Sequence, residues 1–397
     1  MDKEKIFTKS FILEFIALFC SSLVLYILMT TVTERALELG ASSAVAGLAS
    51  SGALIGELVT RFFFSGFLKK TGWKKMLFIS QIIQLIGCCM YFFTNTVALL
   101  LIVRFVHGIF YGFSASVVTT TGMFLLPKSR YGEANGYLLT SVAFALAAGP
   151  TIGGAIKDTF GQSGNYIAAI IVSIVMFIAI YLAKAPYPDV CPETPGENIK
   201  YKGIDKFIEK KTIPIALCVL LTACAYVGIL SFIRLYAASE GMTAFIPAFF
   251  AVYAVVLIIS RPIVGKIQDR YGDAFVIYPC IIFETLSMLL LALFHTPVTM
   301  VMAGALCSLG YGNISSCINA IACRGISPAR KSYAVSTFWV GVNVGMGIGP
   351  VILGAVSGAG SYSSMYLVAA AFAIAAAPAY MFLCRPHWRG SAFEEKR

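Results

Sequence analysis

The chain has 397 residues, of which 58% are hydrophobic and 12% are charged, and its formal net charge is +11. A soluble domain carries roughly a quarter charged residues, so this composition excludes a soluble globular protein, a disordered chain and a soluble nucleic-acid binder. A membrane protein remains, and the excess of positive charge has to be placed within it.

Twelve apolar segments follow one another along the chain, and each is long enough to cross the roughly 30 Å hydrocarbon core of a bilayer as a helix. In chain order they are Ser10–Val32, Ala44–Phe64, Met76–Phe93, Val97–Gly122, Glu133–Ile156, Tyr166–Ala183, Ile213–Tyr236, Thr243–Val264, Phe275–Phe294, Val298–Cys323, Ser332–Val356 and Tyr362–Cys384. The predicted fold class is an all-α membrane protein of twelve transmembrane helices.

A long polar stretch separates the sixth span from the seventh. Prolines come first and lysines follow, at Pro186, Pro188, Pro192, Pro195, Lys200, Lys202, Lys206, Lys210 and Lys211. Such a composition is typical of a linker. We therefore predict an N-terminal six-helix bundle (residues 1–184), a linker (185–212) and a C-terminal six-helix bundle with a short tail (213–397).

The positive charges gather on one side of this arrangement. They are Lys3, Lys5, Lys9, Lys69, Lys70, Lys74, Lys75, Lys128, Arg130, the linker lysines, Lys266, Arg270, Arg330, Lys331, Arg385, Arg389, Lys396 and Arg397. The opposite loops hold little beyond Arg35, Lys157 and Arg234. The positive-inside rule then predicts that both termini and the linker are cytoplasmic, with an uncleaved first helix, and the charge needs no nucleic-acid partner.

The sequence offers no pattern for a cofactor. The eleven cysteines have no C-x-x-C spacing, so we expect free thiols and neither disulfides nor a metal site. No phosphate-binding loop and no paired nucleophile and base stand out. We expect no enzyme activity, cofactor or metal.

Residues recur at an offset of 200 positions in several separate places. The matching pairs are Tyr26 and Tyr226, Thr60–Gly72 and Ser260–Gly272, Tyr111-Gly112 and Tyr311-Gly312, Gly149-Pro150 and Gly349-Pro350, and Gly154 and Gly354. Two homologous halves of six helices with the same orientation form a parallel repeat, related by an axis along the membrane normal.

Four motifs lie at characteristic places in these halves. They are Gly265-x-Ile267-x-Asp269-Arg270-x-Gly272, Leu100-x-x-x-Arg104-x-x-His107-Gly108, Ala145-x-x-x-Gly149-Pro150-x-x-Gly153-Gly154 and Gly345-x-x-x-Gly349-Pro350-x-x-x-Gly354. With them the chain resembles the major facilitator superfamily over essentially its whole length, and in particular the bacterial efflux permeases for drugs, sugars or metallophores. The resemblance implies a multi-pass secondary transporter of the bacterial cytoplasmic membrane, with its substrate site near the midplane between the halves.

The resemblance also implies a gating role for a set of motif residues. These are Arg61, Gly149, Pro150, Arg261, Asp269, Arg270, Gly349 and Pro350. The first copy of the loop motif departs from the pattern, with Ser65 in place of glycine and Lys69 in place of the acid. Asp269 is thus the only intact acid, which puts the usual balance of the gate in doubt. Static close packing is the alternative role of the glycines.

Ionisable groups inside spans are costly and are candidates for function. For proton coupling the candidates are Glu34, Glu57, Arg104 and His107. A buried Arg104 requires a carboxylate, an anion or water as its partner, and Glu34 and Glu57 are the candidate carboxylates. The alternatives are that Arg104 has a purely structural role and that His107 is an interhelical histidine with its hydrogen bonds satisfied.

The sequence also predicts roles for two pairs of charged residues and for one further acid. Glu34 and Arg234 occupy equivalent positions and either close an outer gate or bind opposite ends of a charged substrate, the alternative being two solvated charges. Glu57 and Arg61, four residues apart, have the spacing of a simple pair. Glu284 aligns with Gln84, and we expect it to be a hydrogen-bonded structural carboxyl, either ionised or protonated.

Polar and aromatic stripes on the first, seventh, tenth and eleventh spans predict the substrate-binding residues. These are Tyr26, Thr30, Glu34, Arg35, Tyr226, Arg234, Tyr311, Asn313, Asn319, Trp339 and Asn343. The function predicted from all of this is proton-coupled export of a small polar or amphiphilic solute by a monomer. The alternatives are an uptake carrier or facilitator for an organic anion that uses Arg35, Arg104 and Arg234, a lipid flippase, and a non-transporting membrane sensor.

Overall fold

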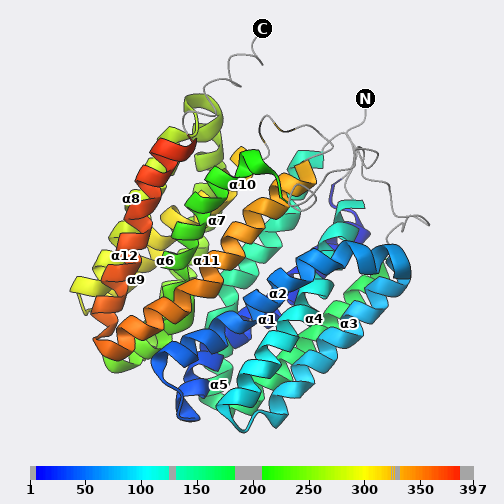
Figure 1. The fold of residues 1–397 in the computed structure, drawn as a ribbon, viewed down its shortest axis with the longest axis horizontal. Helices are drawn as coiled ribbons and strands as arrows, with labels where there is room; N and C mark the ends of the chain where they lie inside the picture. Colours follow the sequence, from blue (N-terminus) through cyan, green and yellow to red (C-terminus); the bar gives the residue numbers. More distant parts are fainter. Residues whose placement is uncertain are drawn as a thin grey trace. The chain divides into compact units, whose positions relative to one another are not determined.

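The computed structural model describes residues 6–124, 131–183, 208–322, 324, 326 and 331–384. These ranges form helices joined by short turns, and no β-strand occurs within them (Figure 1). Among the described residues, eleven helical segments are long and apolar enough to cross a membrane. The protein is therefore an all-α membrane protein, as predicted.

The helices follow the predicted spans closely. They are α1 (Lys9–Glu38), α2 (Ser43–Thr71), α3 (Trp73–Cys89) with the short η1 (Met90–Phe93), α4 (Val97–Phe124), α5 (Tyr131–Ala183), η4 (Lys210–Thr212), α6 (Ile213–Ser239), η5 (Thr243–Phe245), α7 (Ile246–Tyr271), α8 (Ala274–Leu293), α9 (Pro297–Cys307), the π-helical turn η6 (Ser308–Gly312), α10 (Asn313–Ala322), α11 (Lys331–Ala359), α12 (Tyr362–Ala379) and the π-helical turn η8 (Tyr380–Cys384).

Eleven segments correspond to twelve predicted spans because α5 contains two of them. The helix is broken at Gly161, whose φ of 70° and ψ of −174° lie outside the helical region. Glycine adopts a positive φ without the steric cost that other residues meet. The break falls between the predicted spans Glu133–Ile156 and Tyr166–Ala183, so the fifth and sixth crossings are the two parts of α5.

Helix α1 is longer than its hydrophobic stretch. It starts where the Thr8 hydroxyl accepts a hydrogen bond from the amide of Phe11 (3.2 Å) and continues to Glu38. The chain then turns through Gly40, which has a φ of 87°. Glu34 and Arg35 are therefore helical residues in the last turns of α1, with defined directions towards neighbouring helices.

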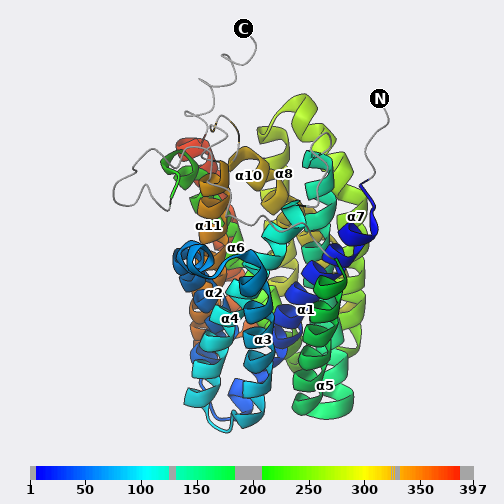
Figure 2. The same ribbon diagram turned by 90° about the vertical axis from the view of Figure 1, so that its right-hand side faces the viewer.

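The chain forms two compact units, which are described separately. The first contains residues 1–41 and 52–192, and the second contains residues 42–51 and 193–397. In the first unit α1 packs along α5 and α3 packs along α4 (Figure 2). In the second unit α6 packs along α11 and α8 packs along α9, so the elements pair in the same way 200 residues later.

The Gly-Pro motifs lie where the paired helices approach most closely. A Cβ on Gly149 of α5 would collide with Tyr26 of α1. A Cβ on Gly349 of α11 would lie only 2.6 Å from a methyl carbon of Val227 on α6. Equivalent helix pairs thus meet at equivalent glycines in both repeats, because glycine lets the backbones of a helix pair come close together.

Candidate functional site

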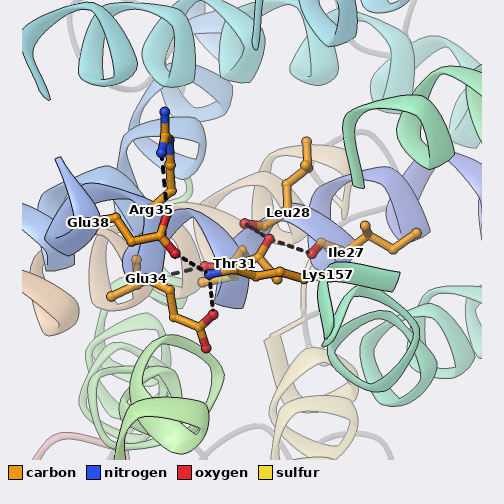
Figure 3. Close-up of polar contacts among 9 residues, drawn as sticks. Ile27, Leu28, Thr31, Glu34, Arg35, Glu38 and Lys157 are labelled. Atoms are coloured by element: carbon orange, nitrogen blue, oxygen red, sulfur yellow. Dashed lines mark hydrogen bonds and ion pairs between the residues drawn. The ribbon is translucent and has the colours of Figure 1, made fainter. Parts of the chain in front are cut away.

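Four charged side chains form a cluster at the end of α1 where that helix meets α5 (Figure 3). Lys157 of α5 donates to Glu34 (Nζ to Oε2, 2.5 Å) and to Glu38 (Nζ to Oε1, 2.9 Å). Arg35 donates to the other carboxylate oxygen of Glu38 at 3.3 Å. We call Glu34, Arg35, Glu38 and Lys157 the Lys157 cluster. Its two cations and two anions balance in formal charge.

The cluster depends on the close packing of α1 and α5. Gly153, one turn before Lys157, meets the backbone of Ile27, and this brings the lysine ammonium within reach of two successive turns of α1. The side chains of Lys157 and Glu34 are only 13% and 14% exposed, whereas Glu38 is 45% exposed. The Glu34 pair is therefore the one that screening by water weakens least.

Lys157 was not among the site residues predicted from the sequence, where it counted as a loop charge. Two signals could have found it: it is one of few cations away from the positive side, and it follows Gly153-Gly154 by one helical turn. Arg234, the predicted partner of Glu34, lies partly buried on α6 in the other unit. That pairing stays a prediction.

Arg104 and His107 lie on α4 in a buried polar network. Arg104 donates to the hydroxyl of Tyr91 (Nη1 to Oη, 3.1 Å), and this hydroxyl lies 3.0 Å from Nδ1 of His107. The side-chain amide of Gln84 lies 3.2 Å from Nε2 of the same ring. Arg104 and His107 are fully buried. With both ring nitrogens in contact with polar groups, His107 has the geometry of a satisfied interhelical histidine.

The two acids considered for Arg104 each have a cation close by. Glu34 contacts Lys157, and Glu57 pairs with Arg61 four residues later on α2 (Oε1 to Nη2, 2.5 Å). Glu57 is 8% exposed, and it lies close enough to Tyr26 and Tyr111 to act on both electrostatically. The first unit thus places a carboxylate, a guanidinium and two tyrosines together on α1, α2 and α4.

The second unit brings two of the predicted substrate residues, Tyr226 and Tyr311, into direct contact. The rings of Tyr226 on α6 and Tyr311 on η6 are stacked, with centroids 4.1 Å apart and planes 9° apart. The ring of Tyr253 on α7 lies 6.2 Å from Tyr226. Asn313 donates to the Ser260 hydroxyl at 2.9 Å. These side chains join α6, α7 and the span formed by α9, η6 and α10.

The other predicted residues are distributed over both units. Thr30, Asn343, Pro150 and Pro350 are buried, Tyr26, Arg61, Arg261, Asn319 and Trp339 are partly buried, and Arg270 is exposed. Arg270 lies over the ring of Tyr271 at 5.3 Å from its centroid. The structure leaves these roles as predictions.

The side chain of the motif acid Asp269 lies outside the part of the chain whose side chains the structure describes. A different acid, Asp273, forms the ion pair at the connection between α7 and α8. Its carboxylate accepts from Arg324 (2.5 Å) and from Gln268 (2.9 Å). Asp273 directly follows the last glycine of the loop motif, which is a signal that sequence analysis did not use. The described residues contain no group of three potential metal ligands.

Comparison with known proteins decides the family. The sequence model of the Major Facilitator Superfamily matches residues 15–329 and 250–396. The chain belongs to this superfamily. It is therefore a multi-pass membrane transporter by family, and its fold is the one that this superfamily shares.

Relatives within the superfamily share about a quarter of its residues. An uncharacterised MFS-type transporter of Methanocaldococcus jannaschii is 25% identical over 73% of this chain and 76% of its own length. The multidrug resistance protein MdtG of Rahnella is 24% identical, over 86% and 84%. A multi-drug resistance efflux pump PmrA homolog of Lactococcus lactis is 24% identical, over 71% of both chains.

Solved structures of superfamily members have the same fold. The nucleoside transporter NupG is similar with a TM-score of 0.70 and 14% identity, covering 95% of this chain and 99% of the other. A bacterial homolog of the human lysosomal transporter Spinster, inward-facing and unoccupied, has a TM-score of 0.71 and 13% identity over 98% of both chains. At these identities the likeness concerns the fold alone.

Proposed function

We propose that the protein exports small amphiphilic organic solutes in exchange for protons. The observation that carries this proposal is the ion pair between buried Glu57 and partly buried Arg61, with Tyr26 and Tyr111 within electrostatic reach of Glu57. The names of two relatives, a multidrug resistance protein and an efflux pump homolog, support the direction of transport. Aromatic rings with one carboxylate suit a solute that is apolar and carries a positive group.

Exchange of the solute for a proton follows because both bind to the same carboxylate, that of Glu57. Ionised Glu57 accepts from Arg61, and a cationic group of the solute competes for the same oxygens. A proton on Glu57 removes the negative charge that both cations need, so the proton and the solute exclude each other. Such exclusion is what an antiporter requires, provided that the two ligands favour different conformations.

The remaining parts of the proposal concern location and the other residues. The proposal includes a bacterial cytoplasmic membrane and a monomeric protein. The distribution of lysines and arginines supports the cytoplasmic side for both termini. Tyr226 and Tyr311 supply an aromatic surface for the solute in the second unit, and Arg104 holds the network of Tyr91 and His107 in place during the cycle.

The test is transport of ethidium, a fluorescent organic cation, by purified protein in liposomes. We expect wild-type protein to move ethidium against its gradient when a pH gradient is imposed, and in the opposite direction when the pH gradient is reversed. Glu57→Gln abolishes the gradient-driven movement. Glu240→Gln, a change at an exposed residue outside the spans, is the matched control and retains it.

Four results would contradict the proposal. Ethidium flux that is unaffected by the pH gradient would exclude proton exchange of this solute. Counterflow of organic acids without a pH gradient would instead favour the uptake carrier, and movement of labelled phospholipid would favour the flippase. Binding of a solute without any flux would favour a sensor.

A further inference from the structure

Glu284 is a fully buried acid in the middle of α8 (Ala274–Leu293). Neither of its carboxylate oxygens has a hydrogen-bond partner among the described residues. The expected hydrogen-bonded structural carboxyl is therefore not what the structure contains. A charged side chain at the centre of a span is costly unless it is paired or wet, so the uncharged acid fits this surrounding.

The first unit shows what a structural residue at this position looks like. Its equivalent is Gln84 on α3, which is fully buried and contacts Nε2 of His107 at 3.2 Å. The equivalent of His107 is Cys307 on α9, which lies within electrostatic reach of Glu284. One half thus pairs a neutral amide with an imidazole, whereas the other half sets an acid beside a thiol, a weak hydrogen-bond donor.

The helix that faces Glu284 also differs between the halves. Residues 108–112 belong to the regular helix α4, whereas Ser308–Gly312 form the π-helical turn η6. Gly310 of this turn approaches α8 so closely that a Cβ would lie 2.6 to 2.7 Å from the backbone nitrogen, Cα and Cβ of Glu284. π-Helical geometry is rare, occurs mostly as single turns inside α-helices and lies frequently at functional sites.

Two titratable groups lie within electrostatic reach of Glu284, namely Cys280 on α8 itself and Cys307 on α9. The other helices packed against α8 carry Tyr311 on η6, Cys317 on α10, Tyr366 on α12, Tyr226 on α6, and Tyr253 and Arg261 on α7. Cysteines and tyrosines are uncharged at neutral pH. Arg261, the cation of this group, lies beside Tyr253 and Cys317.

We propose that Glu284 is a second proton-binding site of the transporter, placed in the second unit beside the π-helical turn. Its carboxylate takes up one proton and becomes neutral, and release of that proton restores the negative charge. A shift of η6 between π-helical and α-helical geometry changes the packing of Gly310 on α8 and gives Glu284 access to water. The inference rests on the proposed proton exchange and assigns part of it to this residue.

The test is Glu284→Gln, which copies the first half and mimics the protonated acid in shape. In the liposome assay with ethidium we expect this variant to lose accumulation driven by the pH gradient by at least tenfold while it keeps equilibrium exchange of the dye. Ser287→Ala is the matched control, because it changes another buried polar side chain of α8, whose hydroxyl donates to the Ala303 carbonyl (2.8 Å), without touching an acid. We expect this control to keep both activities.

A second measurement requires no transport. Infrared difference spectra between acidic and alkaline pH should show the carbonyl band of a protonated carboxylic acid that is missing in Glu284→Gln and present in Ser287→Ala. If wild-type protein shows gradient-driven transport and Glu284→Gln equals it, the inference is wrong although the proposed function holds. If wild-type protein shows no such transport, the proposed function fails. If the infrared difference spectrum contains no carboxylic-acid band that depends on Glu284, the inference is wrong as well.

Discussion

The ion pair between Lys157 and Glu34 allows a quantitative prediction about the stability of the first unit. At an effective dielectric constant of about 20, two unit charges 2.5 Å apart attract by about 7 kcal/mol, and removing both from water cancels most of this attraction. We expect a coupling free energy of about 2 kcal/mol between the two side chains, which is a factor of about 30 in the ratio of folded to unfolded protein. The contact of Lys157 with Glu38, which is 45% exposed, should contribute less than about 1 kcal/mol.

Two double-mutant cycles measure these energies. The variants are Lys157→Met, Glu34→Gln and Glu38→Gln, with the two doubles that contain Lys157→Met. Unfolding is followed by tryptophan fluorescence as sodium dodecyl sulfate is added to protein in a mild detergent. A cycle cancels the effect of other partners of each residue, so only the contact is measured. A coupling for Glu34 below about 0.5 kcal/mol, or one no larger than that for Glu38, would refute the argument from burial.

Three further predictions use the same unfolding measurement. Tyr91→Phe removes a hydroxyl that contacts the buried side chains of Arg104 and His107, and we expect it to lower the free energy of unfolding by about 2 kcal/mol. The control Tyr181→Phe, at an exposed tyrosine, should leave this free energy unchanged, and equal effects of the two variants would contradict the network. Gly108→Ala places a methyl group against the backbone of the neighbouring helix and should lower the free energy of unfolding by about 3 kcal/mol. Gly265→Ala places its methyl group in open space and should leave this free energy unchanged or raise it. The reverse order would show that the helices do not pack as described. Gly161→Ala should lower the free energy of unfolding by about 1–3 kcal/mol because its φ of 70° with ψ of −174° is a conformation that essentially only glycine adopts, and an unchanged stability would contradict that conformation.

The apolar spans could be predicted from the sequence because bilayer thickness fixes the length of a crossing helix. Hydropathy does not determine where a helix ends outside the hydrocarbon region. Backbone conformation does, and glycines with a positive φ lie at these places: Gly40 after α1, Gly72 before α3, Gly161 within α5, Gly241 after α6 and Gly272 after α7. Gly72 and Gly272 are equivalent in the repeat, so the ends of α2 and α7 could have been read from the sequence as well.

The candidate site was harder to predict, because its contacts depend on how each helix is rotated. Glu34 and Lys157 are 123 positions apart, and their contact requires α1 and α5 to be packed by Gly149 and Gly153. The glycine motif indicated that α5 packs closely against another helix, but it did not indicate which helix that is. Tyr91 as the partner of Arg104 could not be predicted either, because it lies on the short η1, where the helical pattern of α3 changes.

The internal repeat carries more information where its halves differ than where they agree. Identical residues such as Gly149 and Gly349 lie at close approaches of paired helices, and selection for packing accounts for them. At positions 84 and 284, and again at 107 and 307, the same two helices meet with different chemistry. Because α3 pairs with α4 as α8 pairs with α9, the pairing of the helices alone does not explain these differences. An acid that replaces an amide at the centre of a span costs stability, and a transporter that uses the proton on that acid has a reason to keep it.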